Sequence, residues 1–231
     1  MHKMVVVGHR GSAGTELENT LAALRAGIDA GADYLEIDIR LTKDQQIVVC
    51  HDPNLARISS SQAVIADLTL EELKHVELHN DERVPTLREA LELVGSTPLF
   101  IEIKEDHMVR PLIQLLADFP NTHHIVTSFR LREAALYKQL QPKTRVYLAT
   151  LANPFEIFQT AKTISADGVA LRFWLLNPLT YLMAHRRKLS IMVYTINSLF
   201  YARFVHFLYP KAMICTDRPG LFHTPRNQPI A

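Results

Sequence analysis

Cysteine is scarce in this chain, with only Cys50 and Cys215 among 231 residues. Two thiols cannot build the disulfide framework of a small secreted domain, so a reducing compartment and a cytoplasmic location are expected. Apolar runs of membrane-spanning length are also missing, and the first predicted strand begins too early for a signal peptide to precede it. The sequence therefore predicts no stable membrane insertion.

A surplus of charge of one sign is missing as well. Lys and Arg number 25 against 24 Asp and Glu, which gives a net charge of +1, and the cations are spread along the chain without a basic run. This balance argues against a nucleic-acid partner, because phosphate backbones are bound by clustered cations. No proline- or serine-rich linker divides the chain, so residues 1–231 are predicted to form a single domain, and an apolar share of 48% is ample for its core. The oligomeric state stays open.

What the chain contains is a regular alternation of strand and helix patterns, with Asn19 and Ser198 as predicted N-caps. Alternating strands and helices form right-handed βα units around a parallel sheet. Eight strands in a chain of this length fit a closed (β/α)8 barrel, the TIM-barrel fold. The predicted strands cover residues 4–8, 34–40, 99–104, 125–128, 146–149, 168–171, 191–194 and 213–216. The predicted helices cover residues 19–30, 86–94, 109–117, 131–140, 154–163, 178–187 and 198–207.

One segment breaks the alternation. Residues 46–51 have a strand pattern, but only residues 42–45 separate them from the preceding strand. A parallel crossover needs a dozen or more residues, so these two strands are predicted to form an antiparallel hairpin. The hairpin would carry His51 toward the mouth of the barrel. A small excursion over approximately residues 42–83, with a short helix start at 67–72, would follow before the next helix.

Polar side chains gather where several of the predicted strands end. His9 follows the first strand, and Glu36 and Asp38 lie on one face of the second because side chains alternate along a strand. Glu102 and Lys104 share one face of the third. All of these would reach the carboxyl-terminal mouth of a barrel, where barrel enzymes hold their active sites. Two carboxylates on one face repel each other without a cation or proton between them, and histidines transfer protons near neutral pH, so the set indicates hydrolysis.

These residues belong to an ordered series of motifs that resembles the glycerophosphodiester phosphodiesterase family nearly end to end. His9-Arg10-Gly11 and Glu18-Asn19-Thr20 are similar to the opening signature of that family, and residues 31–44 with His51-Asp52-Pro53 are similar to its central block. Further similar motifs are Val84-Pro85-Thr86-Leu87, Glu102-Ile103-Lys104, Tyr194-Thr195-Ile196-Asn197 and Thr216-Asp217-Arg218-Pro219. The chain departs from the family pattern at Leu17, at the loop 57–61 and at Tyr194, where proline, a different loop and tryptophan are usual.

The resemblance implies a metal-dependent barrel enzyme that hydrolyses glycerophosphodiesters to glycerol 3-phosphate and an alcohol. The substrate would be a small molecule, and one divalent cation would serve as cofactor. The residues that it implies are a metal site of Glu36, Asp38 and Glu102, an acid–base pair of His9 and His51, and phosphate contacts from Arg10 and Lys104. Glycerol is expected to lie against Tyr194.

The residue types support this chemistry in their own right. A site of carboxylate oxygens suits a hard divalent cation, Mg²⁺ or Ca²⁺. With three ionised carboxylates and a singly charged phosphodiester, one such cation together with Arg10 and Lys104 makes the site neutral. One histidine would deprotonate the attacking hydroxyl, and the other would protonate the leaving oxygen. Whether water or the glycerol 2-hydroxyl attacks stays open.

Two other functions stay open. A lysophospholipase D-like phosphodiesterase would need an apolar, membrane-facing mouth, for which Phe173 and Trp174 are candidates, although packing under the next helix also explains them. A non-catalytic barrel that binds phosphorylated ligands is disfavoured, because no acid, base or metal ligand is missing. Glu18 and Asn19 fit either a functional role or those of a first-turn acid and a cap, and Asp217 is assigned an architectural role.

Overall fold

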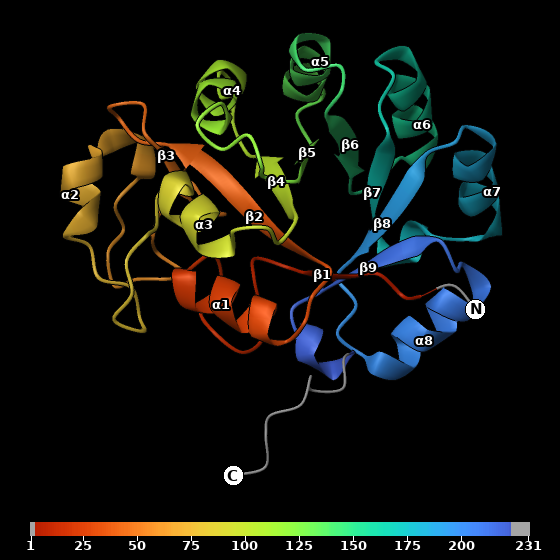
Figure 1. The fold of residues 1–231 in the computed structure, drawn as a ribbon, viewed down its shortest axis with the longest axis horizontal. Helices are drawn as coiled ribbons and strands as arrows, with labels where there is room; N and C mark the ends of the chain where they lie inside the picture. Colours follow the sequence, from red (N-terminus) through yellow and green to blue (C-terminus); the bar gives the residue numbers. More distant parts are fainter. Residues whose placement is uncertain (1–2, 223–231) are drawn as a thin grey trace.

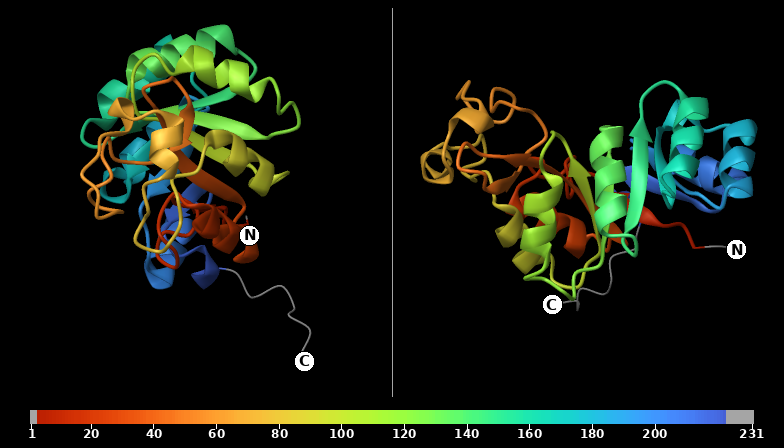
Figure 2. Two further views of the ribbon diagram at one scale, coloured as in Figure 1. Left: turned by 90° about the vertical axis from the view of Figure 1, so that its left-hand side faces the viewer. Right: turned by 90° about the horizontal axis from the view of Figure 1, so that it is seen from above.

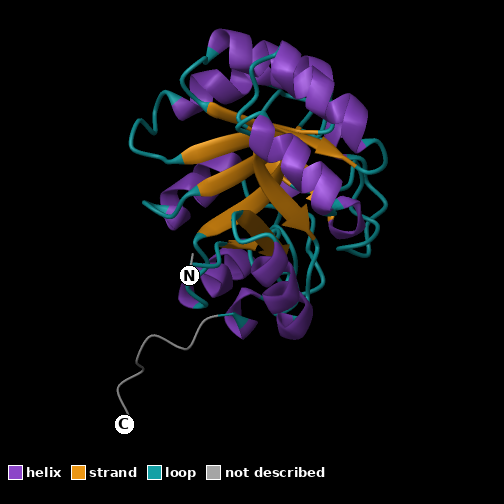
Figure 3. Ribbon diagram, turned by 90° about the vertical axis from the view of Figure 1, so that its right-hand side faces the viewer, coloured by secondary structure: helices purple, strands orange, loops and turns teal. Residues whose placement is uncertain are grey.

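The computed structural model describes residues 3–222. Eight parallel strands form a closed barrel with helices around its outside, which confirms the predicted (β/α)8 architecture (Figures 1 and 3). One additional strand, β3 (Ile47–Val49), lies beside the barrel. The barrel strands are β1 (Val6–Gly8), β2 (Tyr34–Leu41), β4 (Leu99–Ile103), β5 (His124–Ser128), β6 (Arg145–Thr150), β7 (Gly168–Arg172), β8 (Ser190–Tyr194) and β9 (Ala212–Thr216).

Each of the seven predicted helices between barrel strands is present, and its ends differ from the prediction by at most two residues. The short helix expected to start within residues 67–72 is present as α2 (Leu70–Lys74). Among the described helices, none combines the length and apolar character needed to cross a bilayer. The helices are α1 (Leu21–Asp29), α2 (Leu70–Lys74), α3 (Leu87–Val94), α4 (Val109–Leu116), α5 (Leu131–Leu140), α6 (Pro154–Thr163), α7 (Pro178–Arg186) and α8 (Leu199–Leu208). Short 3-10 segments are η1 (Ile65–Asp67), η2 (Phe173–Leu175) and η3 (Pro219–Leu221).

Alternation along the barrel strands divides the apolar residues between two cores. In β4, Leu99 and Ile101 pack outward in the core that includes the helices, whereas Phe100 belongs to the core inside the barrel. Inside the barrel, Phe100 meets Tyr147 edge to face, with 5.3 Å between ring centroids. The same alternation places Glu102 on the inner face, one step closer to the carboxyl-terminal mouth.

The N-cap of α1 is Thr20, so the prediction of Asn19 as its cap is wrong. Thr20 has an extended backbone, and its Oγ1 accepts a hydrogen bond from the backbone N–H of Ala23 at 3.1 Å. Asn19 has a left-handed backbone, with φ of 58°, and its side chain bonds to Asp38 instead. A local pattern could not reveal that bond, which joins two separate elements. Ser198 caps α8, as predicted.

The chain leaves the barrel after β2 and returns before α3. Strand β3 pairs antiparallel with β2, with Ile39 opposite Val49, which confirms the predicted hairpin. The excursion forms one end of the molecule, beside β2 and α3 (Figures 1 and 2). It packs around a small core of its own, composed of Val48, Cys50, Leu55, Ile58, Ile65, Leu73, Leu78 and Val84. That residues 1–231 form a single domain stays a prediction.

Candidate active site

His9 lies just beyond the carboxyl end of β1. Its backbone N–H donates to the carbonyl of Thr216 at 2.8 Å, and its Nδ1 lies 2.6 Å from Oδ1 of Asp217. Because an ionised carboxylate only accepts hydrogen bonds, Nδ1 carries a proton and Nε2 is left for proton transfer. Burial alone would lower the pKa of His9, but the bond to Asp217 and the charge of Glu36 outweigh it and raise that pKa.

His51 is held by an aspartate in the same manner. Its Nδ1 lies 2.7 Å from Oδ1 of Asp52, and Oδ2 of Asp52 accepts from Nε of Arg57 at 2.6 Å. The backbone carbonyl of His51 accepts from Nη2 of Arg40 at 2.6 Å, which fixes the position of the chain after the hairpin. Burial lowers the pKa of His51. Each histidine is therefore oriented through Nδ1 by a carboxylate.

Three carboxylates converge at the mouth of the barrel. Glu36 and Asp38 project from β2, and Asp38 is directly paired with Glu102 of β4 in the parallel register. One oxygen from each of the three side chains lies within 4.8 Å of the other two. Glu36 and Asp38 are buried, and Glu102 is half-buried. The structure thus brings together the residues that the strand alternation predicted.

The three carboxyl groups have different pKa values because their surroundings differ. Burial and the charge of Asp38 raise the pKa of Glu36 to about 8, and the same two causes raise the pKa of Glu102. Burial also acts on Asp38, but Lys104 and Arg10 outweigh it and lower the pKa of that carboxyl. Positive charge from the protein is therefore sufficient to lower the pKa of Asp38, but it does not lower the pKa values of Glu36 and Glu102.

Two cations and an amide surround Asp38. Nζ of Lys104 lies 3.3 Å from its Oδ1 and 2.6 Å from Oε1 of Glu102. Nε of Arg10 lies 3.4 Å from its Oδ2, and Nδ2 of Asn19 donates to that oxygen at 2.9 Å. The Nε atom of Arg10 is buried and makes no hydrogen bond within the described residues. Arg10 and Lys104, predicted as phosphate contacts, are thus held at the carboxylate cluster.

Glu18 links the two sides of the site. It accepts from Nη1 of Arg10 at 2.7 Å and from Nη2 of Arg57 at 2.8 Å, and Arg57 in turn binds Asp52. No acidic residue lies in the first turn of α1, so the alternative of Glu18 as a first-turn acid is wrong. Sequence reasoning missed Arg57, because nothing in the spacing of its loop indicates that it reaches Glu18.

Asp217 was also missed as part of the site. It follows β9 and lies 208 positions from His9 in the chain. Its place at the end of the last strand predicts that it reaches the mouth, but its motif is assigned an architectural role, and the sequence predicts no bond to His9. Its second oxygen accepts from Nδ2 of Asn197 at 2.6 Å, so the carboxylate is fixed on both sides. A signal was present in its position at the end of the last barrel strand, where its side chain reaches the mouth together with His9.

A cavity of about 370 Å³ brings these groups together. One wall carries the two histidines, the three carboxylates, Arg10 and Lys104, and the opposite wall is largely apolar. Tyr194 belongs to the apolar wall: its hydroxyl donates to the carbonyl of Thr150 at 2.9 Å, and its ring meets Phe129 edge to face at 6.2 Å. Leu151 also belongs to that side, and Arg172 adds one cation to it. The cavity therefore offers a charged end and an apolar end to one ligand.

A protein-family sequence model described as the "Glycerophosphoryl diester phosphodiesterase family" matches residues 9–221. A glycerophosphodiester phosphodiesterase from Caldanaerobacter subterraneus subsp. tengcongensis is 32% identical over 173 residues, which are 67% of this chain and 71% of the relative. The chain belongs to the glycerophosphoryl diester phosphodiesterase family. Membership confirms the resemblance seen in the sequence motifs, and it makes the protein an enzyme, so a non-catalytic barrel is no longer a candidate.

Two further proteins are similar to this phosphodiesterase, one in sequence and one in structure. Lysophospholipase D GDPD1 of Homo sapiens is 35% identical over 132 residues, which are 51% of this chain and 42% of that protein. The structure of an Oleispira antarctica phosphodiesterase in complex with the product sn-glycerol-3-phosphate superimposes with a TM-score of 0.88. It covers 94% of each chain at 23% identity, which shows a shared fold.

The donor set of this phosphodiesterase fits a hard divalent cation. Oxygens bound to one Mg²⁺ or Ca²⁺ ion lie about 2.0–2.6 Å from it and hence at most about 5 Å apart, which matches the 4.8 Å limit of the Glu36, Asp38 and Glu102 oxygens. Carboxylate oxygens are the ligands that such ions prefer. The raised pKa of Glu36 agrees with such a site, because burial and the charge of Asp38 disfavour its ionised form and a bound cation would offset both.

Proposed function

We propose that this enzyme hydrolyses glycerophosphodiesters to glycerol 3-phosphate and an alcohol, with one divalent cation, Mg²⁺ or Ca²⁺, held by Glu36, Asp38 and Glu102. The observation that carries the proposal is the meeting of three carboxylates and two aspartate-bound histidines at one cavity. A bound cation would stabilise negative charge on the phosphate oxygens and neutralise the carboxylate cluster.

In this proposal His9 and His51 are the acid–base pair. Both present Nε2 for proton transfer because Nδ1 is bound to Asp217 or Asp52. One histidine removes the proton of the attacking hydroxyl, and the other protonates the leaving oxygen of the alcohol. Arg10 and Lys104, at the charged end of the cavity, hold phosphate oxygens. The Tyr194 ring packs against the glycerol moiety.

A lysophospholipase D-like activity is the second candidate. The apolar wall formed by Phe129, Leu151 and Tyr194 supports it, since an acyl chain could lie there. The human relative named lysophospholipase D supports it too, although the matched region is half of this chain. Turnover of glycerophosphocholine compared with that of a lysophosphatidylcholine separates the two: a faster reaction with the lysolipid would replace the first proposal by the second.

The metal and the two histidines are tested with glycerophosphocholine as substrate. Exhaustive chelation should abolish turnover, and Mg²⁺ or Ca²⁺ should restore it. His9→Ala and His51→Ala should each lower kcat by about 10²-fold or more with little loss of stability, and the double variant should fall well short of the product of the two effects. The exposed His123 provides the control, since His123→Ala should leave kcat unchanged. Full activity after chelation, or near-normal turnover in either single variant, would refute the proposed mechanism.

Head-group preference follows from the shape of the site. The charged end and Tyr194 contact phosphate and glycerol, so the leaving alcohol points out of the mouth and meets few side chains. We expect choline, ethanolamine and glycerol head groups to give kcat/KM values within about tenfold of one another, which corresponds to roughly 1.4 kcal/mol. A preference above about a thousandfold for one of them would show a dedicated head-group pocket.

A further inference from the structure

The balanced charge of the whole chain hides an uneven distribution. Residues 168–216 contain no Asp or Glu but six Lys and Arg residues, whereas the rest of the chain holds 19 basic and 24 acidic residues. This acid-free segment comprises β7, η2, α7, β8, α8 and β9. Its basic residues are Arg172, Arg186, Arg187, Lys188, Arg203 and Lys211. Among residues 3–222, every ion pair to a carboxylate is made by cations outside this segment. Four of the six cations, Arg186, Lys188, Arg203 and Lys211, are exposed and face solvent without a carboxylate partner in that range, whereas Arg172 lines the catalytic cavity.

The same segment carries most of the exposed large apolar side chains among the described residues. Twelve large apolar side chains are exposed in the described residues, and seven of them belong to the acid-free segment. Phe200 and Phe207 of α8 are 83% and 78% exposed, which is extreme for phenylalanine in a folded protein. The other five are Trp174, Leu179, Leu182, Phe204 and Leu208.

Contacts between aromatic rings join the exposed side chains of η2 to those of α8. Phe173 meets Trp174 at 5.1 Å and Tyr201 at 5.6 Å between centroids, and Tyr201 stacks on Phe204 at 6.4 Å. Helix α7 joins it where Tyr181 contacts Tyr209, just after α8, at 5.0 Å. Helices α7 and α8 both lie on the right-hand side of the barrel in Figure 1. We call this surface, formed by η2, α7 and α8, the aromatic face.

We propose that the aromatic face docks on a bilayer surface that contains anionic phospholipid. Exposed phenylalanine and tryptophan enter the headgroup region of a bilayer, and uncompensated Lys and Arg bind its anionic lipids. The helices would lie along the membrane, which agrees with the absence of a membrane-crossing helix among those described. The surface differs from a simple apolar patch because the cations stand among the aromatic residues, as with Arg203 between Phe200 and Phe204 on α8.

A second copy of the chain fits this face less well. In a symmetric dimer the same surface lies on both subunits, so two acid-free, cationic faces would meet. Like charges at an interface repel, and no carboxylate within the segment could compensate them. An anionic lipid surface supplies the missing negative charge.

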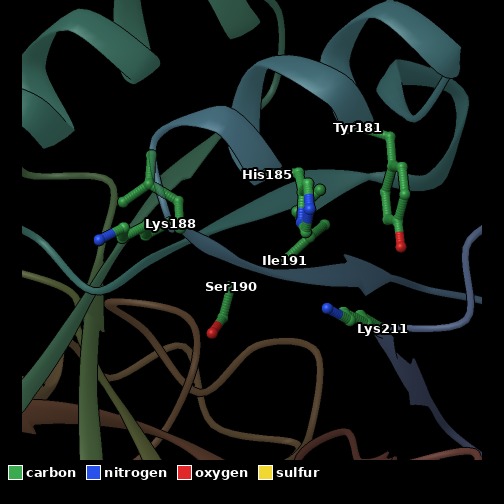
Figure 4. Close-up of a pocket in the computed structure, with 7 residues that line it drawn as sticks. Tyr181, His185, Lys188, Ser190, Ile191 and Lys211 are labelled. Carbon is green, nitrogen blue, oxygen red and sulfur yellow. The ribbon is translucent and has the colours of Figure 1, made fainter. Parts of the chain in front are cut away.

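A basic cavity lies at the carboxyl-terminal end of α7, away from η2, and adds positive charge that anionic head groups could bind. It has a volume of about 290 Å³ and lies where β8 begins. Figure 4 shows His185, Lys211 and Tyr181 around this space, and Lys188 also lines it. No carboxylate is among its lining residues. Cationic groups therefore lie at the carboxyl-terminal end of α7, on α8 at Arg203 and just after α8 at Lys211.

The aromatic face is connected to the active-site mouth through Arg172. This side chain lines the catalytic cavity, and its guanidinium carbon lies 4.8 Å from the centroid of the Trp174 ring. Docking through Trp174 and α8 would therefore hold the apolar wall of the cavity beside the bilayer. The proposal concerns docking alone and stands whether or not the proposed catalytic chemistry is correct.

The experiment measures binding of the full chain to vesicles, with no activity readout. Phosphatidylcholine vesicles with phosphatidylglycerol should bind the protein at low salt, and pure phosphatidylcholine vesicles should bind it at least tenfold more weakly. Near 1 M salt, where the Debye length is about 3 Å, the difference should shrink strongly. Trp174 is the only tryptophan of the chain, so docking through this face should shift its fluorescence emission to shorter wavelength.

Variants then locate the contact. The Phe200→Ser/Phe207→Ser double variant should bind anionic vesicles at least tenfold more weakly, whereas Leu140→Ser, an exposed apolar position on α5, should bind as the wild type does. Arg203→Gln/Lys211→Gln should lower binding about fivefold or more for each charge removed, with the exposed lysines of Lys43→Gln/Lys143→Gln as a matched control. Both pairs are exposed, and circular dichroism checks their folds independently.

Three results would overturn the proposal. The first is wild-type protein that does not bind anionic vesicles at low salt. The second is binding that is lost equally in the test and control variants, or that leaves Trp174 emission unchanged. The third is a dimer in solution that the Phe200→Ser/Phe207→Ser substitutions dissociate, because the aromatic face would then be covered by a second copy of the chain.

Discussion

At the scale of single residues, the two histidines show what a sequence reveals and what it hides. The partner of His51 is the next residue, Asp52, and both stand in one recognisable motif. The partner of His9 is Asp217, at the other end of the chain, and only closure of the barrel brings them together. Strand alternation predicts which side chains reach the mouth, but it does not predict which of them bind one another there.

Asp217 is expected to position His9 and to stabilise its charged form. Asp217→Asn keeps the size of the side chain but removes the charge that raises the pKa of His9. We expect kcat to fall by about 10- to 100-fold with little change in KM, and the limb of the pH profile that His9 controls to move to lower pH. Steady-state kinetics as a function of pH measures both effects. Asp118→Asn, which removes an exposed carboxylate paired with Arg88, serves as the control. An unchanged pH profile would exclude this positioning role.

His124 gives the fold a pH dependence away from the active site. Its Nδ1 lies 3.3 Å from the carbonyl of Thr122 and must donate to it, so Nε2 accepts from the hydroxyl of Tyr137 at 3.1 Å. Burial lowers the pKa of His124 below its ordinary value of 6.5, so the unfolded chain binds more protons than the folded protein as the pH falls.

The contribution of neutral His124 is therefore present above about pH 6.5 and is lost as the pH falls through the lower folded-state pKa. Between pH 7 and 5, the free energy of unfolding of the wild type should decrease more steeply than that of His124→Gln. Urea titrations at several pH values measure this difference. Parallel curves for the two proteins would show that His124 does not control this pH dependence.

At the scale of elements, the sequence was informative because strand and helix patterns are local. Eight apolar runs separated by helical periodicity suffice for the barrel, and helix ends are off by one or two residues because caps depend on individual side chains. Asn19 shows the limit: as a favoured N-cap residue it is locally plausible, yet its amide bonds to Asp38 and leaves the cap to Thr20.

Helix α3 offers a direct test of capping, because it re-enters the barrel after the excursion. Oγ1 of Thr86 accepts from the N–H of Glu89 at 3.1 Å, and the Glu89 carboxylate accepts from the N–H of Thr86 at 2.7 Å. Thr86→Ala breaks this capping box and should lower the free energy of unfolding by about 1 kcal/mol. Thr86→Ser retains the oxygen and should recover most of it in denaturant titrations. An alanine variant as stable as the wild type would contradict the assignment.

At the scale of the whole molecule, the location of the site follows from the fold, whereas the hydrogen bonds and ion pairs within the site do not. A parallel barrel places the ends of all its strands at one mouth, so His9, Glu36 and Glu102 were predicted to meet. The link from Arg10 through Glu18 to Arg57 joins the barrel to the excursion. It could not be predicted, because it depends on where a loop with its own small core packs against the barrel.

The carboxylate cluster also couples metal binding to the stability of the whole molecule. Glu36, Asp38 and Glu102 lie together on two adjacent barrel strands, and their repulsion in the absence of a cation opposes the folded state. A cation that binds the folded protein alone should stabilise it by about 2.7 kcal/mol at a hundredfold excess over its Kd. For a chain of this size, that corresponds to a rise in Tm of roughly 5–10 °C.

Glu102→Gln should reduce this metal-dependent rise in Tm, since it keeps the shape of the side chain but removes one charged ligand. The amide oxygen can still accept from Lys104, so the fold should stay intact. Thermal unfolding with excess Mg²⁺ or Ca²⁺ and with a chelator measures the rise for both proteins. Glu71→Gln, at an exposed carboxylate of α2 that pairs with Lys74, should behave as the wild type does. If Tm does not depend on the metal, or if Glu102→Gln retains the full rise, the three carboxylates do not form the metal site.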